Sequence, residues 1–319
     1  MRKFETPQLV ISKCIEFESC RYNGLKISSQ IVKDLKKNAN FYPVCPEVGI
    51  GLGIPRDPIR LVKIDDEINL IQPSTQRNLT KKMKQFSDSF LNDLNNIDGF
   101  ILKNKSPSCG IKAVRVYPQT MNSRPYNDGI GLFSVSVFEK FPFIPVEDEG
   151  RLRNLKIREN FLTSIYTLAE YRKIKKSEKL IDLIDFHSRN KYLLLSYNQI
   201  LSQKMGRLIG DQKSYSSDDL FQTYGDLLSK TLKTPPEAPA NINMLMHVLG
   251  HFSGKLTHEE KSFFLDAMEK YRQGVMPLLV CLNILKAWVI RFNEDYLKDQ
   301  TFFQPYPEKL MPVTNIQLV

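Results

Sequence analysis

The spacing of apolar residues changes near residue 150, and this change constrains the fold of the 319-residue chain more than any other feature. Before it, short apolar runs alternate with segments of helical spacing, and buried strands are predicted over residues 8–12, 41–44 and 99–102. Helices are expected over residues 29–37 and 84–96. Short apolar strands separated by helices are typical of a parallel sheet with helices on both faces, so we expect a Rossmann-like arrangement here.

Beyond residue 150 the helical spacing continues almost without interruption. Helices are expected over residues 166–183, 186–200, 217–232, 241–252, 258–273 and 278–293. The proline-rich segment 233–239 is expected to be a connection, because proline cannot occupy a helix interior. We place the boundary at the acidic segment 147–150. The chain is therefore predicted to be of the α/β class, with a parallel-sheet domain over residues 1–150 followed by an all-α helical domain over residues 151–319.

The overall composition bears on location and partners. No run of residues approaches the ~18 apolar residues that a membrane-spanning helix needs, and the N-terminus shows no apolar signal segment. We therefore expect a cytoplasmic protein with no membrane partner. Lys and Arg number 45 against 35 Asp and Glu, which gives a net charge of +10 and a pI near 9.2. This excess favours a polyanionic partner such as nucleic acid, and a basic solvated surface is the alternative.

Four of the five cysteines lie in the first 110 residues, each beside turn residues. Cys14, Cys45 and Cys109 follow predicted strands, and Cys20 lies further into the first loop. Neighbouring parallel strands end at one edge of a sheet, so these thiols can meet in space. Their spacing lacks the paired Cys-x-x-Cys of a zinc ribbon and suits an iron–sulfur cluster, the alternative being buried structural thiols. Cys281 lies within a predicted helix among apolar residues and is expected in the core.

Three motifs of the first half resemble those of the thiouracil desulfidase family. They are Ser12-Lys13-Cys14 with Cys20-Arg21-Tyr22-Asn23-Gly24, Cys45-Pro46-Glu47 running to Pro55-Arg56, and Ser106-Pro107-Ser108-Cys109-Gly110. The resemblance covers residues 7–150. The second half resembles the helical partner domain of the prokaryotic RNA desulfidases. The stretches that carry this second resemblance are residues 186–191, 205–208, 247–252, 271–274 with 277–278, and 296–300.

The resemblance implies an enzyme with a 4Fe–4S cluster that removes sulfur from thiolated uracil without net redox change. In the family three cysteines hold the cluster, so one iron has no cysteine ligand. We carry these ligands onto Cys14, Cys45 and Cys109, because these three follow the strands, with Cys20 as the replacement. The two-domain resemblance implies conversion of 4-thiouridine in tRNA to uridine with release of sulfide, the helical domain binding the tRNA.

A carboxylate and two serines stand beside the expected ligands. Glu47, two residues after Cys45, is placed to act as a general acid or base when water attacks the ring carbon. The alternative is a loop residue that caps a helix. The resemblance implies a catalytic serine, which is either Ser106 or Ser108, although each suits a turn beside Pro107 equally well.

Basic side chains are the candidates for contacts with substrate and RNA. They are Arg21, Arg56, Arg60 and Lys105 in the first domain, and Arg189, Lys191, Arg207 and Arg272 in the second. Such groups suit phosphate contacts, and a salt-bridged surface is the alternative. His247 and His251 share a helix face, for which interface or RNA contacts are favoured over a zinc site. The sequence has no Walker phosphate-binding loop, so no nucleoside triphosphate is expected.

Three other functions fit the sequence less well than the desulfidation of tRNA. Desulfidation of free thiouracil needs no RNA-binding domain, so the helical half and the positive charge argue against it. A non-catalytic iron–sulfur sensor does not need a carboxylate such as Glu47 beside a cluster ligand. The reverse reaction, thiolation of tRNA, usually requires an ATP-binding loop, which the sequence lacks.

Overall fold

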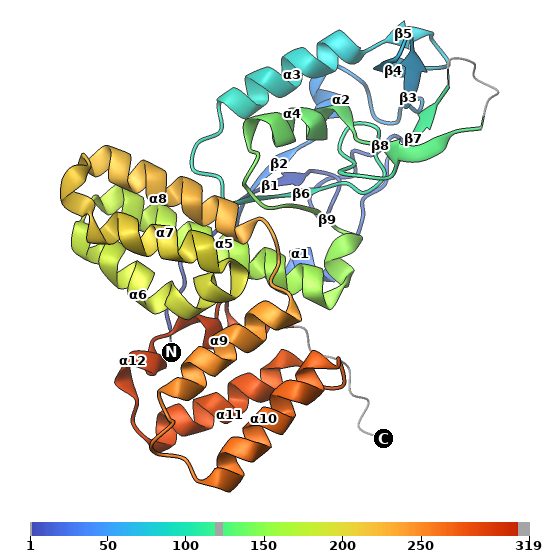
Figure 1. Cartoon of the computed structure of the whole chain (residues 1–319). Coiled ribbons are helices and arrows are strands. Elements are labelled where there is room, and N and C mark those ends of the chain that lie inside the picture. The colour runs from blue at the N-terminus through green and yellow to red at the C-terminus, as the bar shows by residue number, and fades with distance from the viewer. Residues whose placement is uncertain (1, 119–123, 312–319) are drawn as a thin grey trace. The chain divides into compact units, whose positions relative to one another are not determined.

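The computed structural model describes residues 2–118 and 124–311, which form two compact units (Figure 1). The first unit comprises the described residues up to Ala169 together with residues 309–311, and the second is Glu170–Glu308. Helix α5 (Leu155–Ser177) continues from the first unit into the second. The predicted α/β class, with a parallel sheet followed by a helical region, is confirmed. In the described ranges, no helix has the length and apolar character that crossing a membrane requires.

The first unit contains a four-stranded sheet in the order β2-β1-β6-β9. Its strands are β1 (Gln8–Ser12), β2 (Asn40–Val44), β6 (Gly99–Leu102) and β9 (Val146–Asp148). All neighbouring pairs are parallel, so the four carboxyl ends lie at the same edge. The three strands that the sequence predicts are confirmed. The edge strand β9 was not predicted, because its three residues include two carboxylates and show no apolar run.

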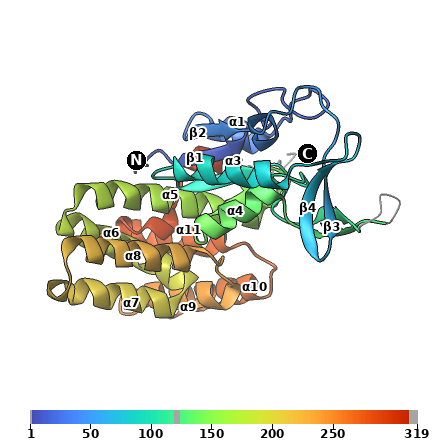
Figure 2. The same ribbon diagram turned by 90° about the horizontal axis from the view of Figure 1, so that it is seen from above.

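A second, mixed sheet follows the order β5-β4-β3-β7-β8. Its strands are β3 (Arg60–Ile64), β4 (Glu67–Gln72), β5 (Arg77–Asn78), β7 (Val114–Tyr117) and β8 (Tyr126–Gly129). Asp65 and Asp66 join β3 to β4 with φ of 46° and 65°. A two-residue hairpin turn of type I′ requires positive φ at both of these positions. In Figure 2, β3 and β4 lie to the right of α3 (Thr80–Asn92).

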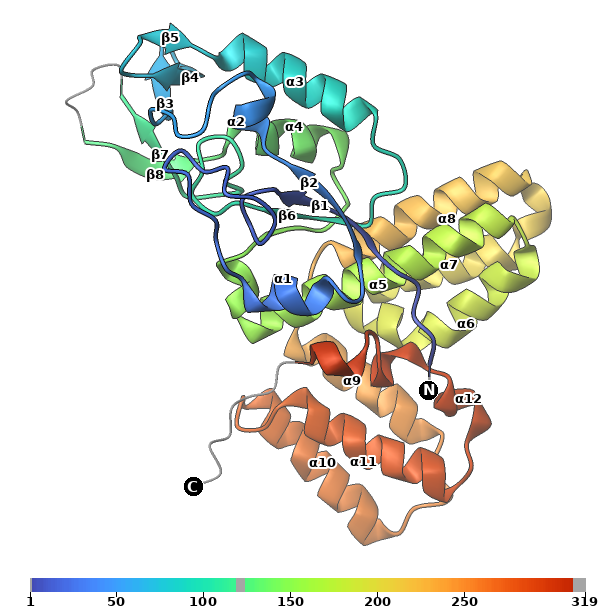
Figure 3. The same cartoon turned by 180° about the vertical axis from the view of Figure 1, so that it is seen from behind.

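Helices cover both faces of the parallel sheet. Figure 3 shows α1 (Gln30–Leu35) on one side, and α3 and α4 (Leu132–Lys140) on the other. The core on the α3 and α4 side joins the two sheets. It contains Phe100 from β6, Leu61 and Leu70 from the mixed sheet, and Phe133 from α4, each fully buried. The two sheets are therefore parts of one hydrophobic core.

The second unit is helical, as predicted. Its helices are α6 (Leu180–Tyr197), α7 (Gln199–Gly210), α8 (Ser217–Leu232), α9 (Ala238–Gly250), α10 (His258–Arg272), α11 (Leu278–Arg291) and α12 (Asp295–Lys298). The helix expected over residues 186–200 ends earlier, because Asn198 caps α7 by accepting a hydrogen bond from the backbone N–H of Leu201. Thr257 and Glu260 form the expected capping box at the start of α10.

The shared core of the two sheets predicts a large effect of truncating Leu70, which is 0% exposed. We expect Leu70→Ala to lower the free energy of unfolding of the first unit by about 2–5 kcal/mol, from lost burial plus the cavity left behind. Leu25→Ala is the matched control, because Leu25 is 56% exposed and belongs to the same unit. Chemical denaturation measures both values, and equal losses would contradict the packing described here.

Candidate functional site

Three cysteines and a glutamate of the first unit lie at the carboxyl edge of the parallel sheet. Cys14 follows β1 by two residues, and Cys45 directly follows β2 and precedes the short helix α2 (Pro46–Gly49). The turn that contains Cys109 follows β6, and Glu149 directly follows β9. A cavity of about 840 Å³ opens at this edge, and all four of these residues line it.

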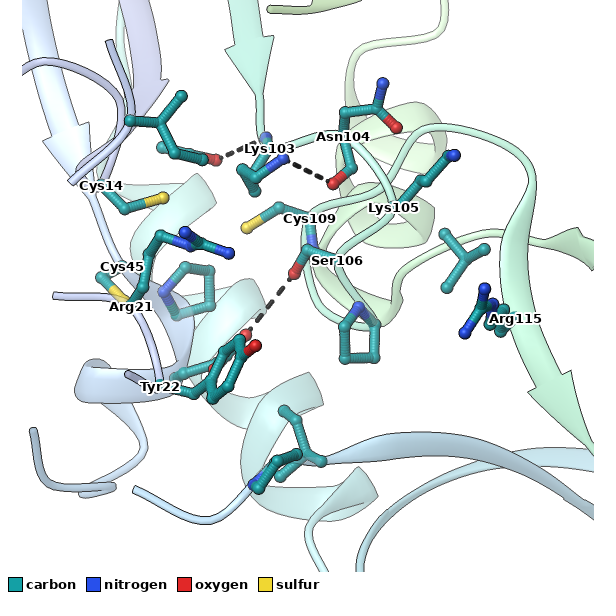
Figure 4. Close-up of a pocket in the computed structure, with 18 of the residues that line it drawn as sticks. Cys14, Arg21, Tyr22, Cys45, Lys103, Asn104, Lys105, Ser106, Cys109 and Arg115 are labelled. Atoms are coloured by element: carbon teal, nitrogen blue, oxygen red, sulfur yellow. Dashed lines mark hydrogen bonds between the residues drawn. The ribbon is translucent and has the colours of Figure 1, made fainter. Parts of the chain in front are cut away.

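The cavity brings together the four thiols that the sequence analysis singled out. In Figure 4 the sulfur atoms of Cys14 and Cys109 point toward one another. The Cys45 thiol donates a hydrogen bond to the backbone carbonyl of Cys20 at 3.9 Å, and, besides burial, repulsion from the charged form of Cys45 contributes to the raised pKa of Cys14, Cys20 and Cys109. The positions of Cys14, Cys45 and Cys109 at three strand ends are those expected of a ligand set, and their role as ligands stays a prediction.

Three of the four thiols are buried, with exposed fractions of 8% for Cys14, 1% for Cys20 and 5% for Cys109. Burial raises the pKa of the Cys14 thiol to about 12, with a further contribution from Cys45. Burial also raises the pKa of Cys20 to about 12 and that of Cys109 well above its ordinary value. Cys281 is fully buried in α11, in the core position expected for it.

The arrangement of the thiols bears on which metal centre this cavity can hold. In residues 2–118 and 124–311, no three His, Cys, Asp or Glu side chains are grouped so that they could hold a metal ion. A single ion draws its ligands to one point, whereas a multi-iron cluster is bound by a separate thiolate at each ligated iron. Soft thiols from three strand ends around one cavity fit an iron–sulfur cluster better than a zinc ion.

The turn that carries Cys109 is fixed by its own side chains and by α4. The Oγ of Ser106 accepts hydrogen bonds from the backbone N–H groups of Ser108 at 3.2 Å and Cys109 at 3.1 Å. Ser134 of α4 donates a hydrogen bond to the carbonyl of Cys109 at 2.8 Å. Gly131 allows the close approach, because a Cβ at this position would lie 2.5 Å from the carbonyl carbon and oxygen of Ser108.

Glu47 lies in the first turn of α2 with both carboxylate oxygens engaged. Its Oε2 accepts two hydrogen bonds from the Arg56 guanidinium, at 2.9 Å and 2.6 Å. Its Oε1 accepts a hydrogen bond from Ser108 at 3.1 Å and from Ser106 at 3.5 Å. Ser106 lines the cavity, whereas Ser108 is fully buried behind it. The two candidate serines therefore contact the same carboxylate from different environments.

The basic residues predicted in the first unit divide into two groups. Arg56 is almost fully buried, and besides Glu47 it donates a hydrogen bond to the carbonyl of Cys20 at 2.9 Å. Arg21, Arg60 and Lys105 line the cavity and have no ion-pair partner in the described part of the chain. Substrate contact by any of the four stays a prediction, and the contacts of Arg56 suit a residue that positions Glu47.

Sequence reasoning missed several residues of the same cavity. Lys103 and Glu149 form an ion pair at 2.5 Å, and Glu149 also accepts a hydrogen bond from the backbone N–H of Asn104. Arg115 and Arg153 line the cavity and, within the described ranges, have no ion-pair partner. Lys103 directly follows the predicted strand β6, so its place at the sheet edge could have been predicted, whereas Glu149 follows β9, a strand that the sequence did not predict.

The basic residues predicted in the second unit lie on three helices, α6, α7 and α10. Arg189 forms ion pairs with Glu170 and Asp185, both at 2.7 Å, and Arg272 pairs with Glu269. Lys191 lies over the ring of Tyr192, and Arg207 is exposed.

The two histidines considered for zinc lie near the end of α9. The Nε2 of His251 lies 2.6 Å from the Tyr192 hydroxyl, and its ring stacks on that of Tyr296. His247 is exposed. In the part of the chain that the structure describes, neither histidine belongs to a group of side chains that could hold a metal ion.

Comparison with known families identifies two domains. Residues 9–149 match the family described as 2-thiouracil desulfurase, and residues 191–307 match the family described as "Protein of unknown function (DUF1722)". The thiols of the cavity lie within the part of the chain that matches the first family, and the helices α7 to α11 lie within the part that matches the second.

Individual proteins match parts of the chain. The protein YbgA of Escherichia coli (strain K12) is 28% identical over 148 residues, which is 46% of this chain and 88% of that protein. The protein YbbK of Bacillus subtilis (strain 168) is 26% identical over 113 residues, 32% of this chain and 72% of that protein. A solved structure of the 4Fe-4S-dependent thiouracil desulfidase TudS is similar at 23% identity with a TM-score of 0.39, covering 48% of this chain and 98% of that one.

The packing of the Cys109 turn predicts that Gly131→Ala is destabilising. Backbone φ is −63° at Gly131, so the alanine conformation is permitted, and the overlap of its Cβ with the backbone of Ser108 and Cys109 opposes it. We expect a loss of about 1–3 kcal/mol in the free energy of unfolding, as is typical of overpacking. Gly250→Ala is the control, because its Cβ meets no atom within 4 Å. Chemical denaturation compares the two variants. A Gly131 variant as stable as the control would show that the backbone of the Cys109 turn can move without cost.

Proposed function

We propose that this protein is an RNA desulfidase that converts 4-thiouridine in tRNA to uridine and releases sulfide. The observation that carries the proposal is that three thiols at strand ends and the hydrogen-bonded carboxylate of Glu47 line one cavity. That cavity belongs to the domain that matches the 2-thiouracil desulfurase family. Desulfidation of a free thiouracil, without RNA, is the other outcome that the experiment below distinguishes.

The cofactor would be a 4Fe–4S cluster held by Cys14, Cys45 and Cys109, with one iron free of cysteine. When bound, such a cluster supplies a soft Lewis acid that attracts electron density from the thiocarbonyl sulfur. Cys20 lies against Cys45 and is the replacement should one of the three not bind. The nearby ion pair of Lys103 with Glu149 fixes the backbone of Asn104 at the same sheet edge.

The chemistry is a hydrolysis that needs no electron donor or acceptor. Water attacks the ring carbon, a C–O bond forms, the C–S bond breaks, and the sulfur leaves as hydrogen sulfide with the two protons of water. Glu47 accepts the proton of the attacking water and returns it, and Arg56 fixes its Oε2 so that Oε1 is presented beside Ser106. Ser106 faces the cavity and is our choice for the catalytic serine, with Ser108 as the residue that positions Glu47.

Substrate binding would use the basic wall of the cavity. Five side chains of this wall have no ion-pair partner in the described ranges: Arg21, Arg60, Lys105, Arg115 and Arg153. They are suited to the phosphate groups beside the thiolated nucleotide, whose base must leave its stack to reach the thiols. The DUF1722 domain would contribute further RNA contacts, for which Lys191 and Arg207 are exposed candidates.

The direct test is nucleoside analysis of thiolated tRNA before and after anaerobic incubation with the reconstituted protein. We expect 4-thiouridine to be replaced by uridine with release of sulfide, and about four irons per chain in the reconstituted protein. Cys14→Ala should abolish iron binding and activity, whereas Cys281→Ala, which alters a buried thiol of the second unit, should keep both. Turnover of free thiouracil with tRNA left intact would overturn the RNA substrate, and a preparation that binds only zinc would overturn the cofactor.

Replacement of the proposed base gives a second test. Glu47→Gln keeps the shape and one acceptor oxygen, which can still accept from Arg56, whereas the amide NH2 replaces Oε1 beside the serines and removes the proton acceptor. We expect the iron content to be unchanged and kcat to fall by about 10²–10⁴-fold, the range typical of general acid–base catalysis. Glu139→Gln, at an exposed position of α4, is the control and should retain full activity. Full activity of the Glu47 variant would remove the role assigned to this carboxylate.

A further inference from the structure

A second cavity, of about 300 Å³, lies on the mixed sheet beside the catalytic cavity. The residues of its wall that matter here are Arg60, Val62, Ile64, Ile71, Asn78 and Tyr117. Arg60 and Tyr117 line both cavities, so these two side chains form a common wall. None of the described residues that line the second cavity carries a negative charge.

The register of the mixed sheet explains why these side chains gather. Ile71 of β4 pairs with Arg60 of β3 and with Asn78 of β5, so the three form one row across the sheet. Val62 of β3 pairs with Tyr117 of β7 in the next row on the same face. Because side chains alternate along a strand, the residues between these rows face the opposite way. Leu61, Leu70 and Val116 are such residues, and all are buried in the core.

The chemistry of this face matches a nucleobase and its backbone. The guanidinium of Arg60 lies over the ring of Tyr117, 4.7 Å from its centroid, which places a cation and an aromatic surface together. Val62, Ile64 and Ile71 provide an apolar floor. The Asn78 side chain donates one hydrogen bond to Asn69 and accepts one from the backbone of Thr80, which leaves an amide N–H for the edge of a base. Apolar and aromatic surfaces with a few amide groups are the features by which proteins bind unpaired bases of RNA.

We propose that the second cavity binds the base of the nucleotide next to the thiolated uridine. The inference rests on the proposed function, and it names the feature that selects a polynucleotide over a free nucleotide. Consecutive nucleotides of one strand can reach both cavities because the two cavities share the side chains of Arg60 and Tyr117 in their walls. A free base or a mononucleotide occupies the catalytic cavity alone and gains nothing from the second.

The test fills the second cavity without touching the first. Val62 lines only the second cavity, so Val62→Trp should exclude a base from it and leave the thiols accessible. We expect KM for thiolated tRNA to rise by about 5–150-fold, the fold-change that corresponds to losing one stacking contact between a base and a side chain. The kcat/KM for 4-thiouridine monophosphate should stay unchanged. Both are measured as anaerobic sulfide release by the reconstituted full chain.

Two further variants make the result specific. Lys63→Trp adds the same bulk to the same strand, but Lys63 lines neither cavity, so both substrates should be processed normally. Ile71→Ala removes part of the apolar floor without adding bulk, and it carries the test if Val62→Trp fails to fold, as thermal denaturation will show.

The outcomes show separately whether the RNA substrate and the base-binding role of the second cavity hold. Wild-type protein that processes 4-thiouridine monophosphate but not tRNA would overturn both the RNA substrate and the second cavity as its subsite. Wild-type activity on tRNA with no selective effect of Val62→Trp and Ile71→Ala would overturn the subsite alone. Equal losses on both substrates would also overturn it, because the second cavity would then serve the reaction itself.

Discussion

Parallel pairing of β1, β2, β6 and β9 is the constraint on which the site depends. Cys14 and Cys45 are 31 residues apart, and Cys45 and Cys109 are 64 residues apart, so neither separation brings the thiols together by itself. The register aligns the ends of the strands, and every segment that leaves a strand begins at the same edge. Close packing of the fully buried central strands fixes this register, since a slip by one residue would exchange side chains of different size between the two faces of the sheet.

Two ion pairs with little exposure then fix the groups around the thiols. The side chains of Arg56 and Glu47 are 5% and 14% exposed, and those of Lys103 and Glu149 are 20% and 8% exposed. Burying a charge is costly unless it is paired and hydrogen-bonded, and here each carboxylate also accepts hydrogen bonds from neutral groups. Loss of one partner would leave the other uncompensated. The pairs therefore give the cavity a rigid wall on two sides, and they explain why Arg56 and Lys103 differ from the unpaired basic residues beside them.

The sequence predicts the parallel sheet and the helices better than the mixed sheet, for physical reasons. The strands at 8–12 and 99–102 are continuous apolar runs because both faces are buried, and α8 has a clear helical period. Strands β3 and β7 are short, and their core residues alternate with charged residues such as Arg60 and Arg115. They therefore lack the continuous apolar run by which the parallel strands were predicted. The gathering of the cysteines follows from topology alone. The partners of Arg56 do not, because they depend on how two loops fold against each other.

The two sheets of the first unit divide the work that the proposed reaction requires. The parallel sheet ends in soft sulfur donors and a fixed carboxylate, which in the proposed reaction would act on a thiocarbonyl but distinguish poorly among the molecules that carry one. The mixed sheet presents Arg60, Arg115 and Tyr117 on the face away from the core, where they are free to contact a ribose-phosphate chain. Because Leu61 and Val116 of the same strands pack into the shared core, the recognition face cannot shift independently of the thiols. Selectivity for a polynucleotide would then arise from the alternation of side chains along each strand. The side chains on one face pack into the core and so fix the position of the side chains on the other face, which contact the substrate.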